Sequence, residues 1–148
     1  MDKQAIKVYI DSNVLVHYCT GVENVVQSLT YLFQRRRKEV LFTSSLSIAQ
    51  TIALLQSNRP NRKAYTKEKV SSLMDGLIKK LTIIDLTKED ISKAFSINNK
   101  DIEDNIQYVL SQKKKCDAIV TDNTKDFLFF KGVEIMKPNK TILSRRIK

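Results

Sequence analysis

The stretch Val8-Tyr9-Ile10-Asp11-Ser12-Asn13 joins a short apolar run to three polar side chains. β-Branched and aromatic residues favour an extended strand, and the polar residues after them favour its end. We therefore predict a first strand over residues 6–10, with Asp11 directly after it. Oxygen-bearing side chains stand beside apolar runs in three further stretches, which are Ser44–Gln50, Asp101–Asp104 and Thr121–Phe127.

These acidic stretches lie in a strongly basic chain. Its 148 residues contain 26 Lys and Arg against 16 Asp and Glu, so the formal net charge is +10. Net charge describes partners rather than fold, and the grouping of the basic residues favours a polyanion surface. Solvated helix ends are the alternative for any single group. The groups that we expect to bind nucleic acid are Arg35, Arg36 and Arg37, and Lys113, Lys114 and Lys115.

Length and composition predict one compact domain with a substantial core. No apolar run approaches the roughly 20 residues of a membrane span, and the N-terminus lacks a signal-peptide segment. Cys19 and Cys116 stand in no metal-ligand spacing, so we expect both to be buried in a cytoplasmic protein without a membrane partner. The single histidine, His17, has no evident acidic partner, and we interpret it as structural or partly exposed.

Predicted strands and helices alternate along the chain. Further strands are predicted over residues 40–43, 81–84, 118–120 and 133–135. Helices are predicted over residues 13–18, 24–38 and 62–80, and others begin at Ser45, Thr87 and Asp101. This alternation predicts an α/β fold, with a parallel sheet of about five strands and helices on both faces. Residues 1–137 would form the domain, and residues 138–148 a basic tail packed on it or extending from it.

The acids are predicted to meet at one edge of this sheet. Sites in open parallel sheets form outside the carboxyl ends of the strands. Asp11 follows the first strand, Asp122, Asn123 and Asp126 follow the fourth, and Asp104 opens the helix leading into the fourth. If these two strands are neighbours, the groups converge. Mg²⁺ and Mn²⁺ prefer oxygen ligands, so the sequence predicts a site for one of these cations.

The chain resembles the PIN domain family, which consists of nucleases and includes the VapC-type toxins of bacterial toxin–antitoxin pairs. Residues 8–15 are similar to the opening motif hydrophobic-Asp-Thr/Ser-Asn-hydrophobic. Residues 101–108 are similar to DFEDALQY, and residues 116–127 are similar to CDxIITRNxxDF. The order and spacing of these motifs match over essentially the whole chain. The resemblance implies a PIN-like α/β/α fold.

The resemblance also implies which acids act. Asp11 matches the first family acid, Asp104 the acid of the middle helix, and Asp126 an acid of the late motif. All three are expected to be catalytic and to bind the metal. Asp122 stands where many members have Arg, and we expect it to be an additional metal ligand.

Five polar residues are expected to support these acids: Ser12, Asn13, Gln50, Thr121 and Asn123. Ser12 and Asn13 match positions that orient the first acid. Gln50 departs from the family pattern, because many PIN nucleases carry Glu there. An amide oxygen can still ligate a hard cation, but it adds no charge, so we expect weaker metal binding.

Helix capping is the competing explanation for these carboxylates. Asp101 and Asp104 are spaced as the N-cap and third residue of a helix. We interpret Asp101 as a cap and Asp104 as a ligand. Asp11 and Asp126 also stand where they can cap a following turn, and for Asp126 the two roles remain open.

The leading functional hypothesis is a metal-dependent endoribonuclease, in which a metal-activated water attacks an RNA phosphodiester in line. The family resemblance implies the toxin of a toxin–antitoxin pair, with an antitoxin partner and a homodimer. An alternative is a PIN-fold RNA-binding module with weak or no hydrolysis, which Gln50 and Asn123 favour because neither carries a charge. An aspartyl phosphotransferase is disfavoured, because such enzymes commonly need a second acid where this chain has Asn13.

Overall fold

The computed structural model describes residues 6–34 and 41–139, and it contains a five-stranded parallel sheet in the order β3-β2-β1-β4-β5. This arrangement confirms the predicted fold class. The basic residues 35–37 and most of the predicted tail lie outside the described residues. The strands are β1 (Val8–Ile10), β2 (Leu41–Ser44), β3 (Thr82–Ile84), β4 (Ala118–Val120) and β5 (Glu134–Met136).

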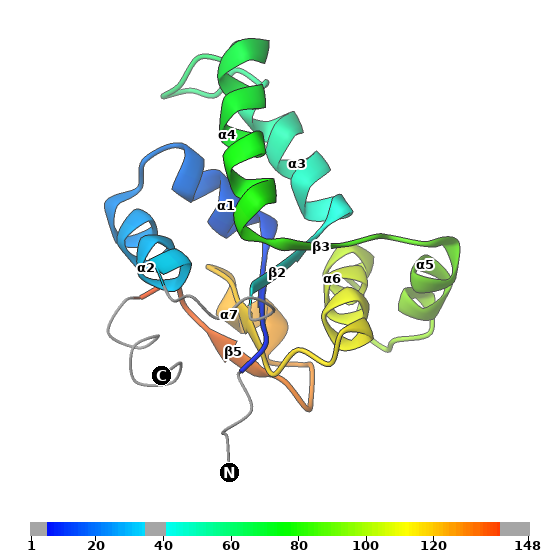
Figure 1. The fold of residues 1–148 in the computed structure, drawn as a ribbon. Coiled ribbons are helices and arrows are strands. Elements are labelled where there is room, and N and C mark those ends of the chain that lie inside the picture. Colours follow the sequence, from blue (N-terminus) through cyan, green and yellow to red (C-terminus); the bar gives the residue numbers. More distant parts are fainter. Residues whose placement is uncertain (1–5, 35–40, 140–148) are drawn as a thin grey trace.

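The strand order reverses between β1 and β4. The chain runs from β1 to β2 and β3 on one side, and then returns to place β4 and β5 on the other side of β1 (Figure 1). Ile10 pairs with Val120 at the carboxyl end of both strands, and the Asp11 N–H donates to the Val120 carbonyl at 3.0 Å. The predicted adjacency of these strands is therefore confirmed. A reversal of this kind leaves a crevice outside the strand ends, where open α/β sheets bind ligands.

Helices cover both faces of the sheet. Successive strand residues point to opposite faces, so Val8 and Ile10 join one core cluster while Tyr9 joins the other. The first cluster packs beneath α1 (Ser12–Cys19), α2 (Glu23–Gln34), α3 (Ser45–Leu55) and α4 (Lys67–Lys80). The second packs against α6 (Ile102–Lys113) and α7 (Thr124–Phe127), and α5 (Lys88–Phe95) lies against α6 (Figure 1).

Two helix starts differ from the prediction. The N-cap of α3 is Ser44, whose Oγ accepts from the Ser47 N–H at 3.1 Å, whereas the Ser45 hydroxyl accepts from the Leu86 N–H. Helix α4 begins at Lys67 rather than residue 62, because residues 59–62 form a bridged turn and Thr66 supplies the cap. Both errors concern which of several neighbouring polar residues acts as the cap.

Other local predictions are confirmed. A capping box opens α5 with Thr87, and Asp101 caps α6 by accepting from the Asp104 N–H at 3.0 Å. Cys19 and Cys116 are both buried, and burial raises the pKa of each thiol. Within the described residues, no helix has the length and apolar character needed to cross a membrane.

Candidate functional site

Asp11 is fixed at the carboxyl end of β1. Its side chain is 5% exposed, Oδ1 accepts from the Ser12 N–H at 2.7 Å, and Oδ2 accepts from the Thr121 hydroxyl at 2.8 Å. Burial raises the pKa of the Asp11 carboxyl, and the charges of Glu103 and Asp122 raise it further. The two hydrogen bonds oppose this increase only in part. The carboxylate is therefore held rigidly in an environment that disfavours its charge.

The loop after β4 is tied to the start of α1. Thr121 is fully buried, and its Oγ accepts from the Asn123 N–H at 3.1 Å and from Asn13 Nδ2 at 3.5 Å. Asn13 Oδ1 accepts from the Asp122 N–H at 3.3 Å. Asn13 thus orients the first acid indirectly, through Thr121, while Ser12 contributes its backbone N–H.

Asp104, in the first turn of α6, lies among several carboxylates. Burial raises its pKa, and the charges of Asp101, Asp11, Asp126 and Glu103 raise it further, to about 7. These five acids come from the end of β1, the start of α6 and helix α7. The charges of Asp11 and Asp126 therefore both act on Asp104, whereas the shared role of the three acids as metal ligands stays a prediction.

Asp122 is paired with His17, which the sequence interpretation left without an acidic partner. The two side chains approach at 2.5 Å, between Oδ2 of Asp122 and Nδ1 of His17. The Asp122 charge still acts on Asp11. The sequence contained no signal for this pair, since only the adjacency of β1 and β4 brings α1 beside the loop that holds Asp122.

The late motif forms the short helix α7. Asn123 occupies its N-cap position without a side-chain capping bond, and Asp126 is the third helical residue, with its side chain exposed. The capping explanation for Asp126 is therefore wrong. Its charge nevertheless reaches Asp104.

The side chain of Gln50 forms hydrogen bonds with two residues of α6. Its Nε2 donates to Oε1 of Glu103, and its Oε1 accepts from Nε2 of Gln107 at 3.1 Å. Gln107 is 2% exposed and accepts from the hydroxyls of Ser47 and Tyr9. Sequence reasoning missed Glu103 and Gln107, although both lie in the matched segment 101–108 at a spacing of four, which places them on one helix face.

The donor set fits a hard divalent cation. Carboxylate oxygens are the ligands that Mg²⁺ and Mn²⁺ prefer, and a cation would relieve the mutual repulsion that raises the pKa of Asp104. Within residues 6–34 and 41–139, no three Asp, Glu, His or Cys side chains converge closely enough to enclose an ion as they stand. These carboxylates would therefore hold a hard cation only together with waters or substrate oxygens.

Comparison with known proteins identifies the family. A family model described as the PIN domain matches residues 7–125. The chain belongs to the PIN domain family. It is also 31% identical over 130 residues to a protein named Ribonuclease VapC1 from Aquifex aeolicus (strain VF5), an alignment that covers 82% of this chain and 83% of that relative.

Solved structures share the fold at low sequence identity. A toxin–antitoxin complex from Klebsiella pneumoniae matches with a TM-score of 0.65 and 15% identity, covering 90% of this chain and 99% of that one. VapBC2 from Rickettsia felis, bound to a DNA fragment from its promoter, matches with a TM-score of 0.63 and 15% identity, covering 89% and 98%. VapC20 from Mycobacterium tuberculosis, a sarcin–ricin loop cleaving toxin, has a TM-score of 0.62 and 13% identity, covering 86% and 99%.

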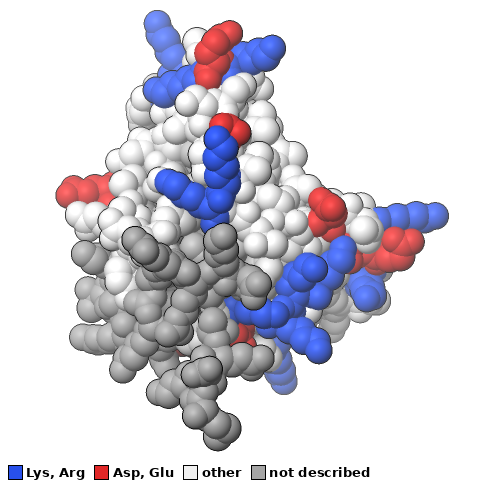
Figure 2. All heavy atoms as spheres, viewed as in Figure 1, with Lys and Arg blue, Asp and Glu red and all other residues white. Residues whose placement is uncertain are grey.

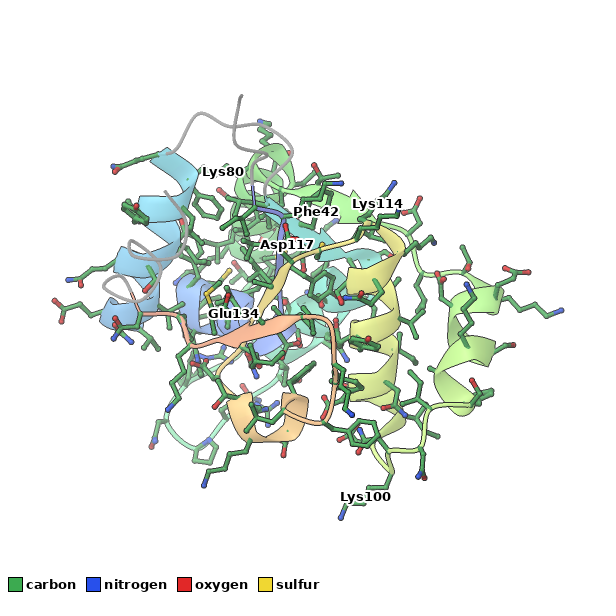
Figure 3. All side chains as sticks on the ribbon, turned by 90° about the horizontal axis from the view of Figure 1, so that it is seen from below. Phe42, Lys80, Lys100, Lys114, Asp117 and Glu134 are labelled. Carbon is green, nitrogen blue, oxygen red and sulfur yellow. The ribbon has the colours of Figure 1, made fainter. Side chains whose placement is uncertain are left out.

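The predicted basic group of this PIN domain lies at the far end of α6 from the acids. Figure 3 shows Lys100 and Lys114 at opposite ends of the helix, so Lys114 lies roughly 15 Å along α6 from Asp104. Lys113 donates to the buried Asp90 carboxylate at 2.9 Å and to the Asp85 carbonyl at 2.9 Å. Lys113 thus has a structural role, whatever Lys114 and Lys115 bind.

Other charges of the PIN domain are dispersed. Figure 2 shows Lys and Arg near the loop joining α3 and α4, over α4 and on the side where α5 and α6 lie, with Asp and Glu among them. A surface cavity of about 380 Å³ lies between α5 and α6, and none of the carboxylates around Asp104 lines it. The residues lining it are Asp90, Lys93, Tyr108, Val109, Gln112 and Lys113.

Proposed function

We propose that this PIN domain is a divalent-metal-dependent endoribonuclease that hydrolyses RNA phosphodiesters. The observation that carries the proposal is the group of acids around Asp104 at the crevice between β1 and β4, where Asp104 has a pKa of about 7. Carboxyl groups whose pKa is raised by burial and by neighbouring acids are typical of functional sites, where they hold a cation or transfer protons. The relative named Ribonuclease VapC1 supports RNA as the substrate.

Asp11 and Asp104 would be the principal ligands of Mg²⁺ or Mn²⁺, with Asp126 and Asp122 as supporting acids. The bound cation would polarise the phosphoryl group and lower the pKa of a water molecule. Ser12 and Thr121 hold the Asp11 carboxylate in one orientation through the bonds described above. Asp104 must lose its proton before it ligates, because a metal ligand carboxylate is deprotonated.

We further propose that the protein is the toxin of a toxin–antitoxin pair and acts as a homodimer with an antitoxin partner. The support is the similarity to chains of solved toxin–antitoxin complexes, because the alignments cover 98% and 99% of those chains. Expression of the chain alone should then stop cell growth, and co-expression of its antitoxin partner should restore it. Growth arrest that persists in an Asp11→Asn variant would contradict a nuclease toxin.

One specific observation favours an RNA-binding module without hydrolysis. Position 50 carries an amide that is used as a hydrogen-bond donor, so it adds no negative charge for a cation. In that alternative, RNA binding persists while Mn²⁺ produces no cleavage. The two hypotheses differ in one measurement, which is the dependence of RNA cleavage on metal.

The test measures cleavage of single-stranded RNA and thermal stability with and without Mn²⁺. Wild-type protein should cleave only with Mn²⁺, and its melting temperature should rise because the ion binds the folded state. Asp11→Asn together with Asp104→Asn should remove both effects. Asp75→Asn is the matched control, since Asp75 is an exposed acid on α4 that pairs with Lys79, and this variant should behave as wild type.

The opposing outcomes are distinct. An unchanged melting curve in millimolar Mn²⁺ would count against the metal site. Stabilisation by Mn²⁺ without cleavage would support the RNA-binding alternative.

A further inference from the structure

Two large apolar side chains are exposed directly after α7. Leu128 is 70% exposed and Phe129 is 51% exposed, and they follow Asp126 by two and three residues. Three residues of chain span at most about 10 Å, so both side chains lie near Asp126, beyond the carboxyl end of β4. Figure 3 shows α7, in pale orange, at the end of the molecule where Lys100 lies. This apolar surface, which we call the Leu128–Phe129 shelf, therefore borders the candidate site.

The ring of Phe129 is supported by an aromatic stack. It packs edge-on against Phe130, with the ring centroids 5.7 Å apart, and Phe130 stacks on Tyr108 at 4.5 Å. Phe130 is buried and also contacts the fully buried Phe127. The Tyr108 hydroxyl donates to the Lys131 carbonyl at 2.8 Å, which ties this loop to α6. A ring on a packed support loses little conformational freedom when it binds a ligand.

Cationic side chains flank the shelf. Lys125 precedes Leu128, the C-cap of α7, by three residues, which makes the two neighbours on the helix surface. Lys131 follows Phe129 by two residues, and both lysines are exposed. Within residues 6–34 and 41–139, neither lysine takes part in an ion pair. Aromatic rings beside lysines suit single-stranded nucleic acid, because the rings stack with bases and the cations neutralise phosphates.

The area of the shelf fits a nucleobase better than a protein. A large aromatic side chain buries roughly 150–250 Å² when it is fully covered, and Phe129 offers only the exposed half of its surface. A specific protein interface covers roughly 800 Å² on each partner. Leu128 and Phe129 together supply only a fraction of that area, whereas a single base can cover them.

We propose that the Leu128–Phe129 shelf is a base-stacking subsite for single-stranded RNA. Phe129 stacks on a base close to the scissile phosphate, and Lys125 and Lys131 contact the RNA backbone. This inference rests on the proposed function, which supplies RNA as the ligand. Because every base has an aromatic face, the subsite positions the substrate without selecting its sequence.

The first test places a fluorophore at the subsite. The chain contains no Trp, so Phe129→Trp introduces a single tryptophan. Binding of a single-stranded oligouridylate in chelator should quench its fluorescence, because a base stacks on the indole ring. Inorganic polyphosphate carries charge without bases and should not quench it. Phe95→Trp is the matched control, since Phe95 is an exposed aromatic residue at the end of α5, and RNA should leave its fluorescence unchanged.

The second test measures affinity for labelled oligouridylate by fluorescence anisotropy, again in chelator. Phe129→Ala should weaken binding roughly 5- to 150-fold, the effect of losing one base–aromatic stack. Phe129→Tyr and the control Phe95→Ala should bind as wild type. Lys125→Gln with Lys131→Gln should flatten the salt dependence by roughly 1.4 in log–log slope, for one phosphate contact each. Urea unfolding verifies that each variant is folded.

The failures are distinguishable. If RNA binds without quenching the Phe129→Trp variant and Phe129→Ala binds as wild type, the subsite is overturned, and Mn²⁺-dependent cleavage decides the proposed function separately. If Phe129→Ala converts a dimer into a monomer in analytical ultracentrifugation and leaves RNA affinity unchanged, the shelf joins two copies of the chain and the subsite is overturned. If wild type binds no RNA at low salt, both proposals are overturned.

Discussion

Replacing Thr121 by Val should destabilise the protein in a pH-dependent manner. The Thr121 hydroxyl is fully buried and donates to the Asp11 carboxylate at 2.8 Å. A hydrogen bond to a charged group contributes about 1.5–3 kcal/mol, and one between neutral groups about 1 kcal/mol. We therefore expect Thr121→Val to lower the free energy of unfolding by about 2 kcal/mol where Asp11 is ionised, and by about 1 kcal/mol where it is protonated.

The direction with pH follows from linkage. The folded-state pKa of Asp11 is already above its ordinary value, so this group costs stability as pH rises through the folded-state pKa. Loss of the Thr121 bond removes an influence that lowers this pKa, and therefore moves it further upward. The penalty of Thr121→Val should consequently grow as pH rises through the folded-state pKa of Asp11.

Urea unfolding in chelator, repeated over a series of pH values, measures this penalty. Thr121→Ser is the control, because it keeps the hydroxyl and loses a methyl group that contributes about 0.8 kcal/mol at every pH. The diagnostic quantity is the difference in free energy of unfolding between the Val and Ser variants as a function of pH. If that difference does not change with pH over the range in which the protein is folded, the Thr121 hydroxyl does not stabilise the charge of Asp11, and the reasoning is refuted.

Three further outcomes are expected. Because Asp104 has a pKa of about 7, Mn²⁺ affinity measured by titration should rise roughly tenfold per pH unit up to that value and then level; Asp104→Asn should abolish the rise. Lys113→Met leaves the Asp90 carboxylate, 4% exposed, without its cation, and should lower the free energy of unfolding by roughly 2 kcal/mol; adding Asp90→Asn should recover part of this loss. Affinity for single-stranded RNA, measured by fluorescence anisotropy, should fall with salt by roughly 0.7 in log–log slope per phosphate contact. Lys114→Gln with Lys115→Gln should flatten that slope and leave Mn²⁺ binding intact, whereas an affinity independent of salt would mean that these lysines are only a solvated helix end.

Most of the fold could be predicted from short-range patterns. Apolar runs identified all five strands to within about two residues, the expected boundary error. The capping box at Thr87 and the cap at Asp101 followed from spacing within one turn. Helix α7, with four residues, escaped prediction because it is too short to establish a helical period.

Part of the candidate site could be predicted in the same way. Asp11 follows the end of β1, and Asp122 and Asp126 follow the end of β4. These acids therefore lie at the same edge of the sheet because the two strands are neighbours. The N-cap of α3 shows the limit of this reasoning. Ser44 and Ser45 are adjacent and both can cap a helix, and only the tertiary structure shows that the Ser44 hydroxyl caps α3 while the Ser45 hydroxyl accepts from the Leu86 N–H.

The sequence by itself determined the elements, the parallel class of the sheet and the positions of the acids along the chain, because these depend on residues within a few positions of one another. The tertiary structure alone decided which side chains meet. His17 bonds to Asp122 across 105 positions, and Gln50 bonds to Glu103 across 53. The pKa of Asp104 likewise depends on burial and on charges brought from separate elements. Such contacts require the assembled sheet, since Coulomb forces and hydrogen bonds depend on distance in space rather than separation in sequence.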